Sequence, residues 1–243
     1  MSGSARFPDV VVIGGGIIGA ACGYYLAREG VSVYLLERSS LASGSSGACE
    51  GNLLAWDKEL TRELPLGRRS FQLWRELVDE LEVDFEYQPK GSVMVAEDEQ
   101  SLAAVEQKVR DLAAAGVPGR MLDPKQLHEE EPALAGDLVG GALFPEDGQV
   151  EPRYATAAMV EGGRRHGMVV RQDCPVRHIA LSPEGRVEAV ETVSGRIPTA
   201  AVVVAAGVWS RDIVATAGLD VPVPAGLLYT IIGMWMASET SLK

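Results

Sequence analysis

A glycine-rich turn between an apolar strand and a helix constrains this chain more than any other feature. The stretch is "VVVIGGGIIGA", residues 10–20. Gly14 permits the tight turn, Gly16 lets the backbone approach a pyrophosphate, and Gly19 allows the helix to pack closely on the strand. The first amides of that helix would face the phosphates, because the positive end of a helix dipole attracts anions. The turn therefore predicts a nucleotide-binding βαβ unit.

The residues after the turn strengthen this prediction. "AACGYYLAREG" indicates a helix, and "VSVYLLER" indicates a second strand that ends near Glu37. A carboxylate about 20 positions after the glycines accepts hydrogen bonds from an adenosine ribose. Turn, helix, strand and acid together predict a dinucleotide site. They do not distinguish NAD from FAD, because both ligands present ADP to the same crevice.

The rest of the chain does not continue a regular alternation of strands and helices. Hydrophobic periodicity predicts helices and short strands in the middle of the chain. The helices cover about residues 61–81, 99–115 and 153–166, and the strands cover 91–96 and 139–144. In the first of these helices the apolar residues at near-helical spacing are Leu66, Phe71, Leu73, Trp74, Leu77, Val78 and Leu81. An NAD-dependent dehydrogenase would ordinarily add further strand–helix repeats, so this architecture favours FAD.

The region 168–205 indicates three strands, separated by the turns "SPEG" and "SGR". The last strand, "AAVVVAAG", is almost unbroken in its apolar character. Such a run is typical of a strand that is buried on both faces of a parallel sheet.

Charge and composition bear on the partners. The net charge of −12 and the absence of a Lys/Arg-rich run exclude nucleic acid as a partner. The longest late apolar run, residues 226–237, is shorter than the roughly 20 residues that a membrane-spanning helix needs.

The three cysteines lie in no CxxC pair, and the first residues do not resemble a secretion signal, which predicts a cytoplasmic protein. Attachment to the surface of the inner membrane stays open. The three histidines lack ligand spacing, so we expect no metal site.

Four segments of the chain resemble the FAD-dependent amine and amino-acid oxidoreductases of the D-amino-acid oxidase type. They are the βαβ unit with Glu37 and Arg38, the small-residue stretch "SGSSGACEGNL", the strand "DCPVRHI" and the strand end "VVVAAGVWS". The resemblance implies that FAD contacts residues in all four. The implied positions are Gly14, Gly16, Ile17, Ile18, Gly19, Glu37, Arg38, Ser45, Ser46, Gly47, Gly51, Asn52, Val176, Ala206 and Gly207. Within this set, the backbone of Val176 would meet the adenine.

The same resemblance implies the fold and the domains. We expect an α/β protein with a Rossmann-like FAD-binding domain of the glutathione-reductase type, interleaved with an incomplete α+β substrate domain. The FAD-binding domain would comprise residues 1–85 and 150–220. The substrate domain would comprise residues 86–149 and 221–243.

The implied reaction oxidises the C–N bond of an amino acid or secondary amine by hydride transfer to flavin N5. The partners would be that small substrate and an electron acceptor, which is oxygen, a quinone or another protein. The sequence does not determine the substrate, the acceptor or the oligomeric state, homo- or hetero-oligomer included. No catalytic residue is identified. The alternatives are a catalytically inactive FAD-binding fragment and an NAD-dependent dehydrogenase.

The final residues depart from the pattern of the family. There the strand near residues 221–224 usually leads into a long segment with arginine and tyrosine side chains that hold the substrate carboxylate. Here the chain continues as "PAGLLYTIIGMWMASETSLK". Because that stretch contains no arginine, the resemblance implies a truncated member in which amino acids do not reduce the flavin.

Three further residues have simple structural explanations. Pro152 in the first turn of a helix, with Glu151 beside the cap, accounts for "GQVEPRY" without a catalytic role. We expect Cys49 to be a small buried filler rather than a redox or covalent site. We expect Trp209 to pack in the core or at a helix start rather than to stack on a substrate.

Overall fold

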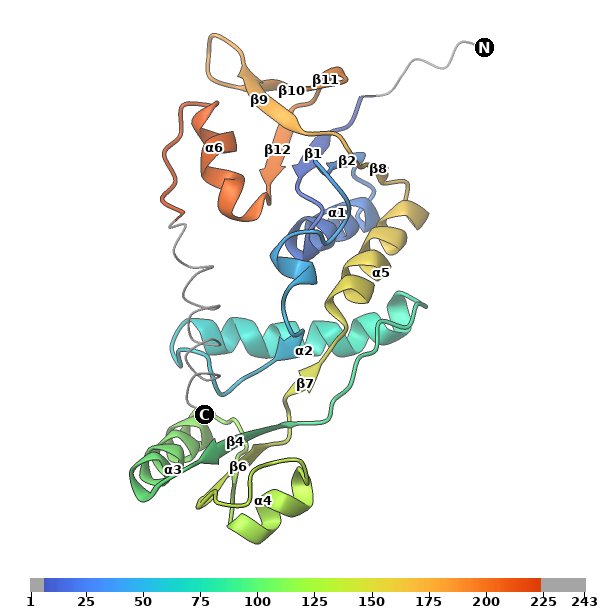
Figure 1. The fold of residues 1–243 in the computed structure, drawn as a ribbon. Coiled ribbons are helices and arrows are strands. Elements are labelled where there is room, and N and C mark those ends of the chain that lie inside the picture. Colours follow the sequence, from blue (N-terminus) through green and yellow to red (C-terminus); the bar gives the residue numbers. More distant parts are fainter. Residues whose placement is uncertain (1–6, 224–243) are drawn as a thin grey trace. The chain divides into compact units, whose positions relative to one another are not determined.

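The structure is a computed structural model that describes residues 7–223 (Figure 1). Within these residues the chain forms two compact units: residues 7–48 together with 156–223, and residues 49–155. They are called the first unit and the second unit below. The apolar run 226–237 and nearly all of the segment 221–243 lie outside the described residues.

A parallel sheet of four strands, in the order β12-β1-β2-β8, is the centre of the first unit. The strands are β1 (Val10–Ile13), β2 (Val33–Leu36), β8 (Val169–Arg171) and β12 (Ala201–Val204). Helix α1 (Ile17–Arg28) connects β1 to β2, which confirms the predicted βαβ unit. Val11, Val12 and Leu35 are fully buried, as expected for central strands of a parallel sheet.

The expectation for the last strand, β12, is wrong. In the described sheet β12 is an edge strand that pairs only with β1. Ala201 is exposed, and the three valines that follow are only half-buried. The apolar run correctly indicated parallel pairing but not the position of the strand in the sheet.

The expectation of three strands over residues 168–205 is also wrong, because the structure has five. An antiparallel sheet in the order β11-β10-β9 lies between β8 and β12 in the sequence. Its strands are β9 (Val176–Leu181), β10 (Val187–Thr192) and β11 (Gly195–Pro198). Asp173 has a φ of 51° and Pro175 has no N–H to donate, so β8 and β9 are separate strands. The first unit also contains the short elements η1 (Ser45–Gly47), η2 (Gly207–Trp209) and α6 (Ser210–Ala215).

The second unit combines antiparallel strands with helices. One sheet has the order β4-β6-β5, and the short strands β3 and β7 form an antiparallel pair. The strands are β3 (Asn52–Leu53), β4 (Ser92–Ala96), β5 (Arg120–Leu122), β6 (Gly140–Phe144) and β7 (Gly148–Gln149). The helices are α2 (Glu63–Glu80), α3 (Glu99–Ala114) and α4 (Pro124–Glu130). Helix α5 (Pro152–Arg165) leads from this unit into the first.

The core of the second unit lies between its helices and its sheet. Leu112 on α3 and both Ala142 and Phe144 on β6 are fully buried. On α2, Phe71, Trp74 and Leu77 are buried, and Leu81 follows the helix in the same state. Leu66 and Val78 are exposed, so the predicted apolar face of α2 is narrower than the sequence indicated. The expected α/β class, with a Rossmann-like part and an α+β part, is confirmed.

Candidate functional site

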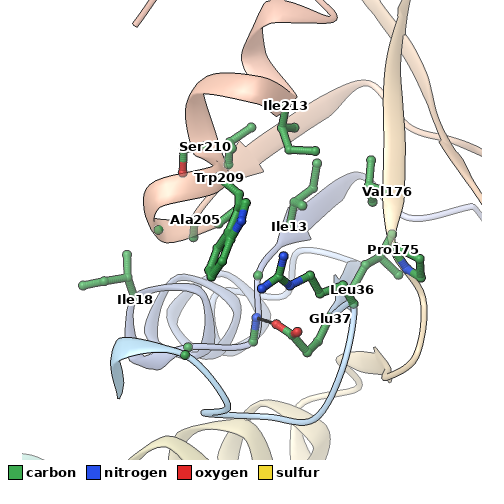
Figure 2. Close-up of a pocket in the computed structure, with 18 of the residues that line it drawn as sticks. Ile13, Ile18, Leu36, Glu37, Pro175, Val176, Ala205, Trp209, Ser210 and Ile213 are labelled. Atoms are coloured by element: carbon green, nitrogen blue, oxygen red, sulfur yellow. Dashed lines mark hydrogen bonds between the residues drawn. The ribbon is translucent and has the colours of Figure 1, made fainter. Parts of the chain in front are cut away.

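A cavity of about 650 Å³ lies at the carboxyl ends of β1, β2 and β12 in the first unit (Figure 2). Its walls come from five segments that are far apart in the sequence. These are the glycine turn, residues 36–38, residues 43–46, residues 174–176 and the stretch after β12. Ligands of open parallel sheets bind beyond this edge, at the point where the strand order reverses. In this sheet that point is next to β1.

The three glycines of the turn serve two purposes. Gly14 has a φ of 116°, and a Cβ there would collide with the Ala205 carbonyl oxygen. A Cβ on Gly19 would collide with the Gly14 carbonyl oxygen, so this glycine allows α1 to pack against the end of β1. At Gly16 the backbone is in an ordinary conformation, and a Cβ would meet only the Ser46 hydroxyl, at 2.9 Å. Gly16 therefore keeps the approach to the backbone open, while Gly14 and Gly19 serve packing.

The N-terminus of α1 faces this cavity without a side-chain cap or an acidic residue in its first turn. The Ile17 N–H donates to the Ser46 hydroxyl over 2.9 Å. Among the described residues no group accepts a hydrogen bond from the N–H of Gly16 or Ile18. Ile18 is also 66% exposed. Unsatisfied amides and the positive helix end together make this part of the cavity wall suited to an anion.

Glu37 is fixed at the cavity wall by the backbone on both sides of it. Its carboxylate accepts the Gly15 N–H over 2.7 Å and the Ser39 N–H over 2.9 Å, one on each oxygen. The residue is only 9% exposed. A carboxylate has about four acceptor positions, so each oxygen keeps one for a ligand. Glu37 can therefore hold the turn and bind hydroxyl groups at the same time.

The small-residue loop after β2 is attached to the glycine turn. The Ala42 N–H donates to the Gly15 carbonyl over 2.9 Å, and Ser46 accepts from Ile17. Ser45 and Ser46 line the cavity in η1, and Gly47 ends that element. The loop is thus part of the wall rather than a free surface segment.

Most of the predicted cofactor positions gather around this one cavity. It is lined by Gly14, Gly16, Ile18, Glu37, Arg38, Ser45, Ser46, Val176, Ala206 and Gly207. Ile17 and Gly19 are the neighbouring residues of α1. Gly51 and Asn52 belong to the second unit, where Gly51 has a φ of 72° and the Asn52 amide donates to Glu50 over 3.0 Å. The role of these two residues stays a prediction.

Trp209 confirms one part of a sequence expectation and corrects the other. It lies at the start of α6, as expected, but it is 44% exposed and lines the cavity instead of packing in the core. The Arg38 guanidinium carbon lies 3.6 Å from the centroid of its ring. Sequence reasoning also missed Pro175, Asp212 and Ile213, which line the same cavity. The available signal was that Pro175 lies in the segment after β8, whereas Asp212 and Ile213 lie on α6, which follows the turn after β12.

The cysteines correct another expectation. Cys49 is exposed rather than buried, whereas Cys174 is buried and lines the cavity. All three cysteines lie within the described residues and form no disulfide. Between residues 7 and 223, no cluster of His, Cys, Asp and Glu side chains is arranged to hold a metal ion. Over the same range no helix has the length and apolar character to cross a membrane.

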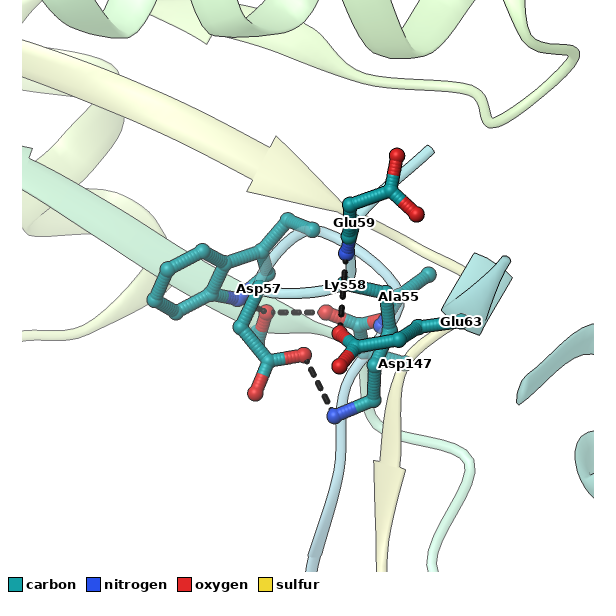
Figure 3. A network of polar contacts seen from close by, with 8 residues as sticks. Ala55, Asp57, Lys58, Glu59, Glu63 and Asp147 are labelled. Carbon is teal, nitrogen blue, oxygen red and sulfur yellow. Dashed lines mark hydrogen bonds and ion pairs between the residues drawn. The ribbon is translucent and has the colours of Figure 1, made fainter. Parts of the chain in front are cut away.

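The second unit contains a buried carboxylate with a polar network of its own (Figure 3). Asp147 is fully buried and accepts the Ala55 N–H over 2.8 Å and the Ser92 hydroxyl over 2.5 Å. The Trp56 indole N–H donates to Ser92 over 3.1 Å. Burial raises the pKa of Asp147, although the two hydrogen bonds that it accepts oppose the shift. Asp147 thereby fixes the segment after β3 to the turn between β6 and β7.

Comparison with known proteins supplies the family. The profile of the FAD dependent oxidoreductases matches residues 9–234. The chain belongs to this family. The resemblance to FAD-dependent oxidoreductases seen in the sequence is thus confirmed.

Individual relatives are similar over most of this chain but are longer than it. Glycine oxidase of Geobacillus kaustophilus is 31% identical over 222 residues, which are 88% of this chain and 58% of that protein. The mitochondrial pyruvate dehydrogenase phosphatase regulatory subunit of Mus musculus is 30% identical, over 84% of this chain and 23% of its own length. A solved structure of Geobacillus kaustophilus glycine oxidase gives a TM-score of 0.82 with 30% identity, over 88% of this chain and 59% of that one.

Proposed function

We propose that the first unit binds FAD in the cavity at the end of β1, and that the protein oxidises the C–N bond of an amino acid or secondary amine. The observation that carries the proposal is the uncapped N-terminus of α1 beside Glu37. When bound, FAD supplies the hydride acceptor, and a substrate that loses a hydride and a proton leaves as an imine. The glycine oxidase relative supports an amino acid as substrate.

The cavity residues fit the ADP half of FAD. The free amides of Gly16 and Ile18 and the Ser45 and Ser46 hydroxyls would hold the pyrophosphate. The unused acceptor positions of Glu37 would take the ribose hydroxyls. Further contacts proposed from the family resemblance involve Gly14, Ile17, Gly19, Arg38, Gly47, Gly51, Asn52, Val176, Ala206 and Gly207. Membership of the family favours FAD over NAD.

A second candidate function is FAD binding without catalysis. It is favoured by the relative whose name describes a regulatory subunit of a phosphatase. Anaerobic mixing of the FAD-loaded chain with glycine, sarcosine, D-alanine and D-proline distinguishes the two candidates. Bleaching of the flavin absorbance by one of these compounds supports the oxidoreductase and contradicts the sequence expectation that amino acids do not reduce the flavin of this chain. An unchanged spectrum with every one agrees with that expectation and favours the binding protein.

Substitution of Gly16 tests the cofactor site directly. Gly16→Ala places a methyl group where the pyrophosphate must approach the amides, without straining the backbone. We expect FAD binding, followed by quenching of flavin fluorescence, to weaken by about 10- to 100-fold, the equivalent of one charge-assisted hydrogen bond. The matched control is Gly67→Ala on α2, whose Cβ would make only an ordinary contact of 3.7 Å with Lys58. Equal affinities of the two variants would contradict the placement of the ligand.

A further inference from the structure

The stack of Arg38 on Trp209 lies across the end of the central strand of the site. Arg38 follows β2 and Trp209 follows β12, and these two strands are the neighbours of β1 on its two sides. Two strand spacings of about 4.8 Å each separate them, so that only long side chains reaching toward one another can meet. Figure 2 shows the Trp209 indole extending from the turn after β12 toward the start of α1. The pair therefore bridges the edge of the sheet at the strand that leads into the glycine turn.

Arg38 has the charge that the expected ligand requires. Among the described residues that line the cavity it is the only basic one, and the acidic ones are Glu37 and Asp212. Within the described part of the chain it forms no ion pair, and Glu37 beside it is held by backbone N–H groups instead. The contact that fixes the guanidinium is the indole face, at 3.6 Å. A cation held over an aromatic ring keeps its charge available, because the ring does not neutralise it.

We propose that Arg38 and Trp209 form a strap that encloses the ADP moiety of the ligand, with Trp209 as the positioning residue for the Arg38 guanidinium. The inference rests on the proposed function, since it takes a dinucleotide as the ligand. Trp209 keeps a large exposed surface that adds an aromatic wall to the cavity. The strap acts on the ADP half alone. FAD and ADP should therefore depend on it equally, and riboflavin should not depend on it.

Titrations of the chain with FAD, ADP and riboflavin test the strap. Trp209→Leu should weaken binding of FAD and ADP by the same factor, roughly 3- to 30-fold, the range of a cation–π contact. Trp209→Phe, which keeps an aromatic face, should recover most of the loss. Arg38→Met should weaken both ligands and reduce the dependence of ADP binding on ionic strength, because a charge that faces phosphate is removed. Riboflavin binding should be unchanged in all three variants.

A double-mutant cycle separates positioning from independent contacts. If Trp209 acts through Arg38, the double variant Arg38→Met with Trp209→Leu binds ADP little more weakly than the weaker single variant. Additive losses would overturn the positioning role.

ADP should also quench tryptophan fluorescence in the wild type and in Trp74→Phe, but much less in Trp209→Phe.

The outcomes also distinguish the strap from the proposed function. Wild-type chain that binds neither FAD nor ADP overturns the proposed function, and the strap with it. Wild-type binding that is retained in full by Trp209→Leu, with the thermal unfolding of the variant unchanged, overturns the strap alone. Equal losses for riboflavin and ADP would also overturn it, because they would place Trp209 against another part of the ligand.

Discussion

The Glu37 carboxylate connects the glycine turn to the end of β2 and still has acceptor positions that face the cavity. This combination explains why an acid is needed here, since an amide has only one acceptor oxygen. Glu37→Gln should weaken FAD binding by about 1.5–3 kcal/mol, the contribution of hydrogen bonds to a charged group. Fluorescence titration measures the change, and Glu188→Gln on the exposed face of β10 is the matched control. FAD affinity equal to that of the control would remove Glu37 from the ribose site.

Asp147 makes the stability of the fold depend on pH, because burial raises the pKa of its carboxyl group above the usual 3.8. The folded chain then holds a proton that the unfolded chain releases, over the pH window between 3.8 and the raised pKa. The contribution of Asp147 to the free energy of unfolding is therefore complete below that window, and it is lost as the pH rises through the window. Asp147→Asn should remove this part of the pH dependence.

Urea unfolding between about pH 4 and pH 7 measures the effect of Asp147. Trp56 and Trp74 report on the second unit, which contains Asp147. The control is Asp137→Asn at an exposed position, which should keep the slope of the wild type. An Asp147→Asn variant with the slope of the wild type would show that the carboxyl group is not responsible.

At the level of single elements, helix α5 depends on the residue before it. The Glu151 carboxylate accepts the Tyr154 N–H over 2.7 Å, and Pro152 occupies the first helical position. Loss of such a cap costs about 0.5–2 kcal/mol of stability. Glu151→Ala should therefore lower the free energy of unfolding by this amount, while Glu151→Asp, a preferred capping residue, should lose less. Urea denaturation of both variants measures the loss. A Glu151→Ala variant with the free energy of unfolding of the wild type would contradict the capping role.

The elements that could be predicted are those whose own residues mark where the element begins and ends. Helix α3 is an example: Asp98 and Ser101 form a capping box, and Gly116 after it has a φ of 79°. Strand β5 is the opposite case, because three residues show no alternation and pairing with β6 defines the strand. The position of β12 at the sheet edge likewise depends on strand order, which a single apolar run does not encode.

The same distinction holds for the candidate site. Gly14, Gly16 and Glu37 could be placed from spacing alone, because one βαβ unit contains them all. The contact of Arg38 with Trp209 joins residues from the two segments of the first unit, which are far apart in the sequence. This contact forms only because β12 pairs with β1, so no local sequence pattern predicts it.

At the scale of the whole molecule, FAD binding should stabilise the fold and should do so from the first unit. A ligand that binds only the folded state adds about 2.7 kcal/mol at a concentration of 100 times its Kd. The thermal unfolding of the chain, followed by circular dichroism, should shift upward accordingly. At the same FAD concentration the Gly16→Ala variant should gain about 1.4 kcal/mol less for each tenfold loss of affinity. Hydrogen exchange should slow in peptides of β1 and α1, which would form the pyrophosphate site.

Riboflavin at the same concentration is the control, since it lacks the ADP half that these elements would hold. Equal shifts with FAD and riboflavin, or slowed exchange that leaves α1 out, would contradict the assignment of the cavity to the ADP half of the cofactor.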